Sequence, residues 1–99
     1  MEEVLYFNEL YDLYSGLLTD KQREYFEDYY FNNLTLQEIS ENNLVSRNAV
    51  FKQIKEAEQK LHFYEEKLRI YEKNMLLDRQ LEQLENEKIK EEIKRIIWE

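Results

Sequence analysis

The stretch LTLQEISENNLVSRNAVFKQIKEAEQKL, residues 34–61, decides the fold. Thr35 followed by Glu38 is a capping-box pattern that predicts the start of a short helix, and the polar run ENNLVS predicts its end. Ser46 predicts the N-cap of a second helix, because its hydroxyl can accept hydrogen bonds from the free amides of the first turn. Two helices joined by a tight turn indicate a helix-turn-helix.

The second of these helices has two distinct faces. Its apolar residues recur at spacings of four, three and four, which predicts one buried stripe formed by Val50, Ile54, Ala57 and Leu61. On the other face, Arg47 and Asn48 are candidates for base edges, since Arg pairs with guanine and Asn with adenine, while Lys52 and Lys55 are candidates for phosphates. Exposed cations are equally typical of a solvated helix. The pattern therefore leaves open whether the motif binds nucleic acid or is only a packing unit.

Composition favours one almost wholly helical unit. The chain has 99 residues, of which 42% are hydrophobic and 36% charged, with one Gly and no Pro. Its formal net charge of −8 is unevenly spread: residues 1–34 carry −6, residues 35–60 carry 0 and residues 61–99 carry −2. The neutral block contains the motif, so a local basic face can still meet phosphate within an acidic chain.

The N-terminal third predicts two helices rich in aromatic residues. VLYFNELYDLYSGLL, residues 4–18, has the spacing of an amphipathic helix, and we expect a left-handed Gly16 to end it. Thr19 with Gln22 repeats the capping-box pattern and predicts the next helix. Asn32 and Asn33 predict the turn that follows. We expect the tyrosines to serve in the core and in subunit contacts rather than as a stacking platform for single-stranded RNA, because their neighbours are acidic.

The C-terminal third predicts long helices with an uncovered apolar stripe. The apolar stripe of the helix that begins after Ser46 continues through Tyr64, Leu68, Tyr71 and Met75. A bend or a reversal is expected near Asn74 to Asp78, where the apolar spacing shifts. Whether residues 56–99 form one bent helix or two antiparallel helices stays open. The new apolar register predicts a homo-oligomer interface, with a heteromeric partner as the alternative. Its residues are Leu77, Leu81, Leu84, Ile89, Ile93 and Ile96.

Several classes of function are disfavoured. The absence of cysteine excludes thiolate metal sites and thiol nucleophiles. His62 is the only histidine, and one His among surface carboxylates does not make a metal site. We therefore expect a protein that is not an enzyme and has neither a metal nor a cofactor. MEEVLYFNEL does not resemble a signal peptide and no window reaches the length of a membrane span, so we expect a cytoplasmic location.

Two resemblances extend this reading. Residues 17–61, LLTDKQREYFEDYYFNNLTLQEISENNLVSRNAVFKQIKEAEQKL, resemble the C-terminal helix-turn-helix of bacterial sigma factors. Nearly the whole chain resembles the YlxM family, through YDLYSGLLTDKQREYFEDYY, VSRNAVF and IYEKN. The resemblance implies an all-α, sigma-factor-like fold of the winged-helix-like DNA-binding class. In this reading residues 1–61 form the helix-turn-helix domain, and residues 62–99 form a long C-terminal helical extension of the same structural unit.

The YlxM resemblance also implies a function and partners. The family is associated with the signal recognition particle, so the expected role is that of a non-catalytic regulator or accessory factor in co-translational protein targeting. DNA, the particle's RNA and the particle's GTPase are the implied partners, and an adaptor that binds only the GTPase is the alternative. The family's recognition helix maps onto residues 46–52, which adds Ser46 and Phe51 to the candidate nucleic-acid-binding residues.

One departure from the sigma-like pattern concerns the turn of the motif. Asn43 and Leu44 stand where an apolar residue followed by Gly or Asn is common. A left-handed Leu costs about 1 kcal/mol, so we predict that Asn43 takes the left-handed conformation and that Leu44 turns inward.

Overall fold

The computed structural model describes residues 2–98, and this part of the chain is all-α. It contains six α-helices, one 3-10 turn and no strand. The elements are α1 (Glu2–Tyr14), η1 (Ser15–Leu17), α2 (Asp20–Tyr30), α3 (Leu36–Asn43), α4 (Arg47–Leu68), α5 (Ile70–Leu81) and α6 (Glu87–Trp98). The predicted fold class is confirmed.

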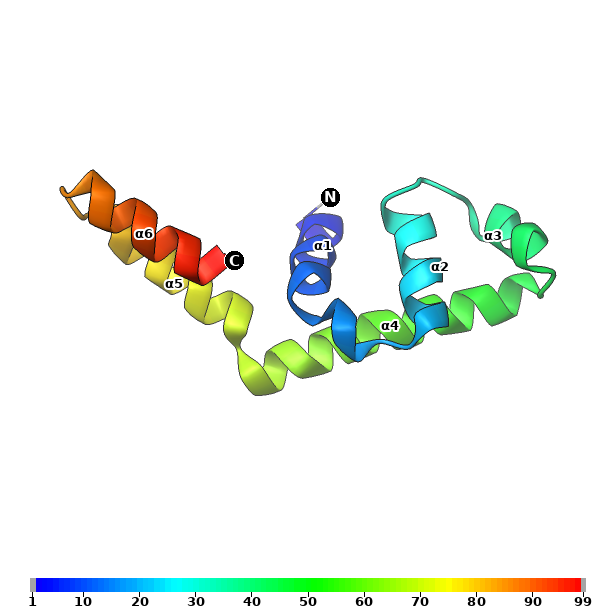
Figure 1. Ribbon diagram of the computed structural model, residues 1–99. Helices are drawn as coiled ribbons and strands as arrows, with labels where there is room; N and C mark the ends of the chain where they lie inside the picture. The colour runs from blue at the N-terminus through cyan, green and yellow to red at the C-terminus, as the bar shows by residue number, and fades with distance from the viewer. Residues whose placement is uncertain (1, 99) are drawn as a thin grey trace.

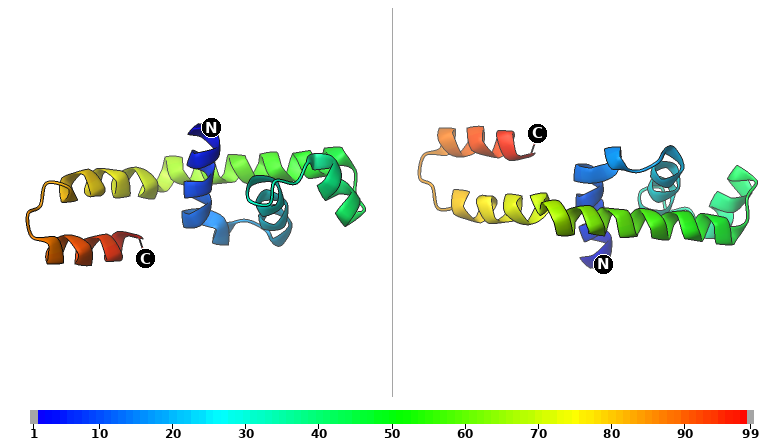
Figure 2. Two further views of the ribbon diagram at one scale, coloured as in Figure 1. Left: turned by 90° about the horizontal axis from the view of Figure 1, so that it is seen from above. Right: turned by 90° about the horizontal axis from the view of Figure 1, so that it is seen from below.

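The 22-residue helix α4 organises the molecule. Helices α1, α2 and α3 lie against it one after another along its length (Figure 1). Beyond its end, α5 and α6 form an antiparallel hairpin that extends away from this body (Figure 2). The result is an elongated molecule, with extents of 55 × 25 × 23 Å.

The core consists of two clusters that share the buried stripe of α4. One joins α1, α2 and the later part of α4, and its buried residues are Leu10, Tyr11, Tyr14, Leu18, Phe26, Ala57 and Leu61. The other joins α2, α3 and the start of α4 through Tyr25, Ile39, Val50 and Ile54. The predicted stripe is therefore confirmed, and it holds the first turns of α4 in a fixed position under α3.

Most of the tyrosines belong to this core, as expected, whereas Tyr29 is exposed. Tyr11, Tyr14 and Tyr25 are buried, and the Tyr11 ring stacks on Phe26 with 4.7 Å between ring centroids. Two of the hydroxyls donate to carboxylates at 2.7 Å, Tyr11 to Glu27 and Tyr14 to Glu65. A buried phenol is thus kept hydrogen-bonded while its ring packs.

The predicted helix starts are also confirmed. Thr19 and Thr35 each form a complete capping box, with Gln22 and Glu38 respectively. Ser46 caps α4 through its hydroxyl, which accepts from the Ala49 amide at 3.0 Å. These bonds link residues three apart in sequence, which explains why local spacing predicts them.

The prediction for Gly16 is wrong, because Gly16 does not adopt a positive φ. Instead α1 tightens into the 3-10 turn η1, in which the Leu18 amide donates to the Ser15 carbonyl at 3.1 Å. A 3-10 turn satisfies the last carbonyls with right-handed residues, so no left-handed glycine is needed.

The predicted bend near Asn74 to Asp78 is also wrong. That segment lies inside α5, and the chain bends earlier, at Arg69, where α4 ends and α5 begins. The reversal comes later, between Leu81 and Glu87. The spacing of apolar residues does not locate the bend, where Glu65 bonds both to Tyr14 of α1 and to the first amides of α5.

Candidate nucleic-acid interface

Helices α3 and α4 form the predicted helix-turn-helix. Ile39 on α3 is fully buried against Val50 and Ile54 of α4, and Val45 of the turn packs against the same cluster. Ser40 is small and buried, and its hydroxyl donates to the Gln37 carbonyl at 2.7 Å. This packing aims the opposite face of the first turns of α4 outward.

The turn between the two helices is a Schellman motif with a left-handed leucine. Leu44 has φ 55° and ψ 42°. Its amide donates to the Glu41 carbonyl, and the Val45 amide donates to the Ser40 carbonyl at 3.1 Å. These two bonds satisfy carbonyls at the end of α3 and bring Val45 into the core, which offsets the cost of a left-handed leucine.

Our prediction for Asn43 and Leu44 is therefore wrong in both parts. Asn43 is the last residue of α3, and its side-chain amide donates to the Ile39 carbonyl at 2.8 Å. Leu44 points outward and is 93% exposed. The Schellman bonds determine which residue becomes left-handed, and the composition of the turn gave no signal of their register.

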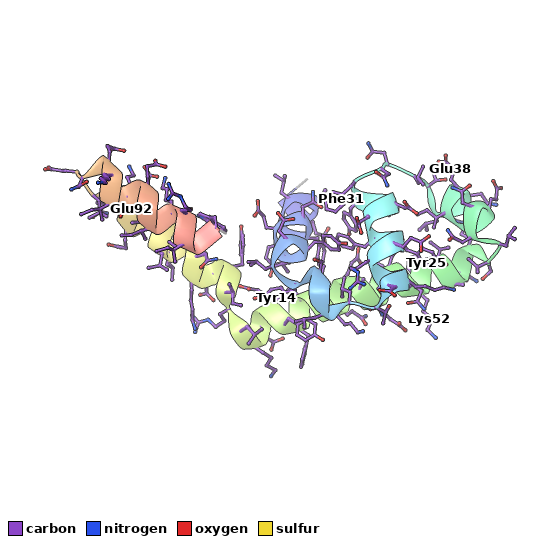
Figure 3. The ribbon with its side chains drawn as sticks, in the orientation of Figure 1. Tyr14, Tyr25, Phe31, Glu38, Lys52 and Glu92 are labelled. Atoms are coloured by element: carbon purple, nitrogen blue, oxygen red, sulfur yellow. The ribbon has the colours of Figure 1, made fainter. Side chains whose placement is uncertain are left out.

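The candidate residues all lie on the exposed face. Ser46, Arg47, Asn48, Phe51, Lys52 and Lys55 are each exposed. Helical spacings of three and four bring them together on one side of α4. Figure 3 shows Lys52 projecting outward from α4, whereas Tyr25 lies on the packed side.

The cations on this face are not equivalent. Lys55 Nζ lies 3.2 Å from Glu58 Oε1 and 5.5 Å from the centre of the Phe51 ring, so its charge is partly engaged within α4. Among residues 2–98, neither Arg47 nor Lys52 forms an ion pair. These two side chains are available to an anionic ligand. Ser46 has a different role, since its hydroxyl is used in capping the helix.

Two exposed apolar side chains lie near this face. Phe51 is 48% exposed, and the outward Leu44 of the turn was not among the predicted site residues. Large exposed apolar groups beside cations are suited to thymine methyl groups or to unstacked bases. Leu44 could have been found only from the turn geometry.

The six residues of the predicted interface do not all lie on the surface of the α5–α6 hairpin. Leu77, Leu84, Ile89 and Ile96 are exposed, and Ile96 reaches 78%. Leu81 is only 5% exposed and Ile93 is half-buried, because they face the inside of the hairpin. Lys94 and Lys90 bridge to Glu82, and the Trp98 indole N–H donates to Asp78 at 3.0 Å. Four of the six residues thus remain candidates for contact with another molecule.

No group of three or more His, Asp or Glu side chains within residues 2–98 is arranged to hold a metal ion. The ring of His62 makes an edge contact with Tyr6, at 6.1 Å between ring centroids. None of the helices described here is both long and apolar enough to span a membrane.

Comparison with known proteins agrees with the motif. Residues 1–98 match the model of the UPF0122 family, described as "Putative helix-turn-helix protein, YlxM / p13 like". A UPF0122 protein of Caldanaerobacter subterraneus is 47% identical over 84% of this chain and 71% of its own. One of Fusobacterium nucleatum is 38% identical over 98% and 94%. One of Bacillus cereus is 42% identical over 98% and 93%.

Proposed function

The chain belongs to the UPF0122 family of YlxM/p13-like helix-turn-helix proteins, and from this premise we propose that it binds nucleic acid through the first turns of α4. The ligand is duplex DNA or the structured RNA of the signal recognition particle. The expected role is that of a non-catalytic accessory factor in co-translational targeting, in the cytoplasm. The helix-turn-helix supports the binding, whereas the pathway rests on the YlxM resemblance alone.

One observation carries the binding proposal. Arg47, Asn48 and Lys52 occupy the exposed first turns of α4, and no carboxylate occurs between residues 42 and 55. The Ser46 cap and the buried Val50 and Ile54 hold these turns in place without using the outward side chains. A guanidinium and an amide at these positions can pair with base edges, while lysines contact phosphates.

Alanine at Arg47, Lys52 and Lys55 together should abolish most of this binding. The measurement is fluorescence anisotropy with labelled duplex DNA and with signal-recognition-particle RNA across a salt series. Each phosphate contact that is lost should reduce the slope of log K against log salt by about 0.9 on a duplex. The variant should therefore bind more weakly and also show a shallower salt dependence.

A charge-matched variant serves as the control. Lys67, Lys73 and Arg79 are exposed cations outside the motif, so their replacement by alanine removes the same charge while leaving the first turns of α4 intact. Equal losses in both variants would mean that only overall charge matters. Absence of wild-type binding to either ligand at low salt would contradict the proposal and would leave the motif as a scaffold.

The second candidate function is that of an adaptor for the targeting GTPase. The acidic N-terminal block and the net charge of −8 favour it, because both oppose strong binding to nucleic acid. The exposed apolar side chains of the hairpin also favour it. In this reading the helix-turn-helix only supports the surface that meets the GTPase.

We also expect the hairpin to mediate self-association. Aspartate at Leu77, Ile89 and Ile96 should convert an oligomer into a monomer, because these exposed side chains can lie at an interface without being needed inside the hairpin. Sedimentation velocity measures the change in mass. Aspartate at Lys73, Gln80 and Glu85 is a control on exposed polar positions of the same segment. A wild-type protein that sediments as a monomer at high concentration would contradict this expectation.

A further inference from the structure

The junction of α4 and α5 consists of a single left-handed residue. Arg69 has φ 55° and ψ 32°, and helical residues lie directly on both sides of it. The left-handed conformation is unfavourable for any residue with a side chain. No glycine or proline occurs here, so local sequence does not explain the bend. Something outside the local backbone must hold it.

Side chains replace the backbone acceptors that the bend removes. In a continuous helix the amides of residues 70, 71 and 72 would donate to the carbonyls of residues 66, 67 and 68. In the bent chain the Ile70 amide donates to the Tyr14 hydroxyl at 3.3 Å. The Tyr71 and Glu72 amides donate to the two oxygens of the Glu65 carboxylate, each at 3.0 Å. All three amides therefore keep a partner.

Glu65 is buried at the junction, and both oxygens of its carboxylate accept hydrogen bonds. Glu65 is only 7% exposed, and its carboxylate also accepts a hydrogen bond from the Tyr14 hydroxyl at 2.7 Å. The carboxylate lies at the N-terminus of α5, where the helix dipole favours a negative charge. Tyr14 comes from α1, and Tyr6 of the same helix makes an edge contact with Tyr71 at 5.8 Å. Part of what holds the bend thus comes from α1, which packs against α4 and α5 (Figure 1) and carries Tyr14 (Figure 3).

A straight alternative would satisfy the same backbone groups. If Arg69 became right-handed, α4 and α5 would join into one helix from Arg47 to Leu81, and the three amides would regain carbonyl acceptors. The straight form relieves the strain at Arg69 but loses the contacts of Glu65 and Tyr14. Two arrangements that each satisfy the backbone are what a two-state element requires.

We propose that residues 65–72 form a switchable hinge, in which the Glu65 carboxylate and the Tyr14 hydroxyl latch the bent state. The hinge sets the direction of the α5–α6 hairpin relative to the helix-turn-helix. It also shapes a groove of about 730 Å³, since α1, α4 and α5 all contribute to its lining, through Tyr6, His62 and Met75 among others. A partner that displaces α1 or fills this groove changes the balance between the two states.

The test is a distance measurement between α4 and α5. Spin labels are attached to two introduced cysteines, Gln59→Cys and Gln80→Cys. Because the chain has no cysteine of its own, only these two positions are labelled. In a continuous helix these positions are separated by about 31 Å, and the bend shortens the separation. Glu65→Ala leaves the Tyr71 and Glu72 amides without acceptors in the bent form. We expect its distance distribution to move to about 31 Å while circular dichroism stays helical.

A second pair of variants decides the outcome if Glu65→Ala fails to fold. Tyr14→Phe keeps the ring but removes both hydrogen bonds of the hydroxyl, so a component at about 31 Å should appear. Adding Arg69→Gly should suppress that component about fivefold, because glycine adopts the left-handed conformation without strain. A folded Tyr14→Phe or Glu65→Ala variant whose distances equal those of the unmutated chain would overturn the proposal.

Discussion

Replacing Phe26 with alanine is expected to lower the free energy of unfolding by about 3–5 kcal/mol. Phe26 is fully buried, and its ring stacks between Tyr11 and Tyr30, with centroid distances of 4.7 and 4.3 Å. Deleting it leaves a cavity where α1, α2 and α4 meet, and the rigid rings around it cannot collapse to fill the space. Urea denaturation followed by circular dichroism measures the loss.

This loss is large relative to the whole stability of the protein. A domain of this size is stabilised by about 5–15 kcal/mol, so Phe26→Ala should remove a substantial part of it. Phe31→Ala is the matched control, because Phe31 is the same residue type at the end of the same helix but is 43% exposed. It should cost less than half as much. If both variants lost the same free energy of unfolding, burial of Phe26 would not be what stabilises the core.

Stability is also expected to fall steeply above pH 10. Burial, followed by the hydrogen bond to the Glu65 carboxylate, raises the pKa of Tyr14 to about 12. Burial and the bonds to Glu27 and Glu58 likewise raise the pKa values of Tyr11 and Tyr30. In the unfolded chain a tyrosine pKa is about 10. The unfolded state therefore releases these protons first as the pH rises.

The sign of the effect follows from this order of titration. Below pH 10 both states hold the tyrosine protons, and the contribution of these groups to stability is complete. As the pH rises from 10 through the raised pKa values, the unfolded state is increasingly favoured. The measurement is the urea midpoint at intervals between pH 8 and pH 12.

Two variants separate titration from packing in this experiment. Tyr14→Phe should flatten the decline above pH 10, because it removes one of the groups with a raised pKa. Ile39→Ala removes a buried side chain of the other cluster, so it should lower the midpoint at every pH without changing the slope. A decline in Tyr14→Phe as steep as in the unmutated protein would refute the assignment.

Features that depend on neighbours in sequence were predicted correctly. The caps at Thr19, Thr35 and Ser46 join residues three apart, and the buried stripe of α4 follows the helical period. The exposed face around Arg47 follows from the same period, so its geometry was predictable. Its role in binding nucleic acid stays a prediction, because exposure does not identify a ligand.

Features that depend on the register of a turn or on distant residues were not predictable. The left-handed residue of the motif is Leu44 rather than Asn43, because bonds to the carbonyls of Glu41 and Ser40 determine the register of the turn. Leu81 and Leu77 belong to the same apolar register, yet only Leu81 is buried, since α6 covers one side of α5. The spacing of apolar residues cannot tell which member of a stripe a neighbouring helix will cover.

The sequence by itself therefore determined an all-α chain, the starts of α2, α3 and α4, the helix-turn-helix and the side of α4 that stays exposed. Each of these rests on hydrogen bonds or burial repeated over three or four residues. Only the tertiary structure decided where the long helix bends. At that bend the carboxylate that accepts the first amides of α5, Glu65, also accepts a hydrogen bond from a hydroxyl 51 residues away, that of Tyr14. Such a contact exists only after α1 has packed on α4, so no local pattern can encode it.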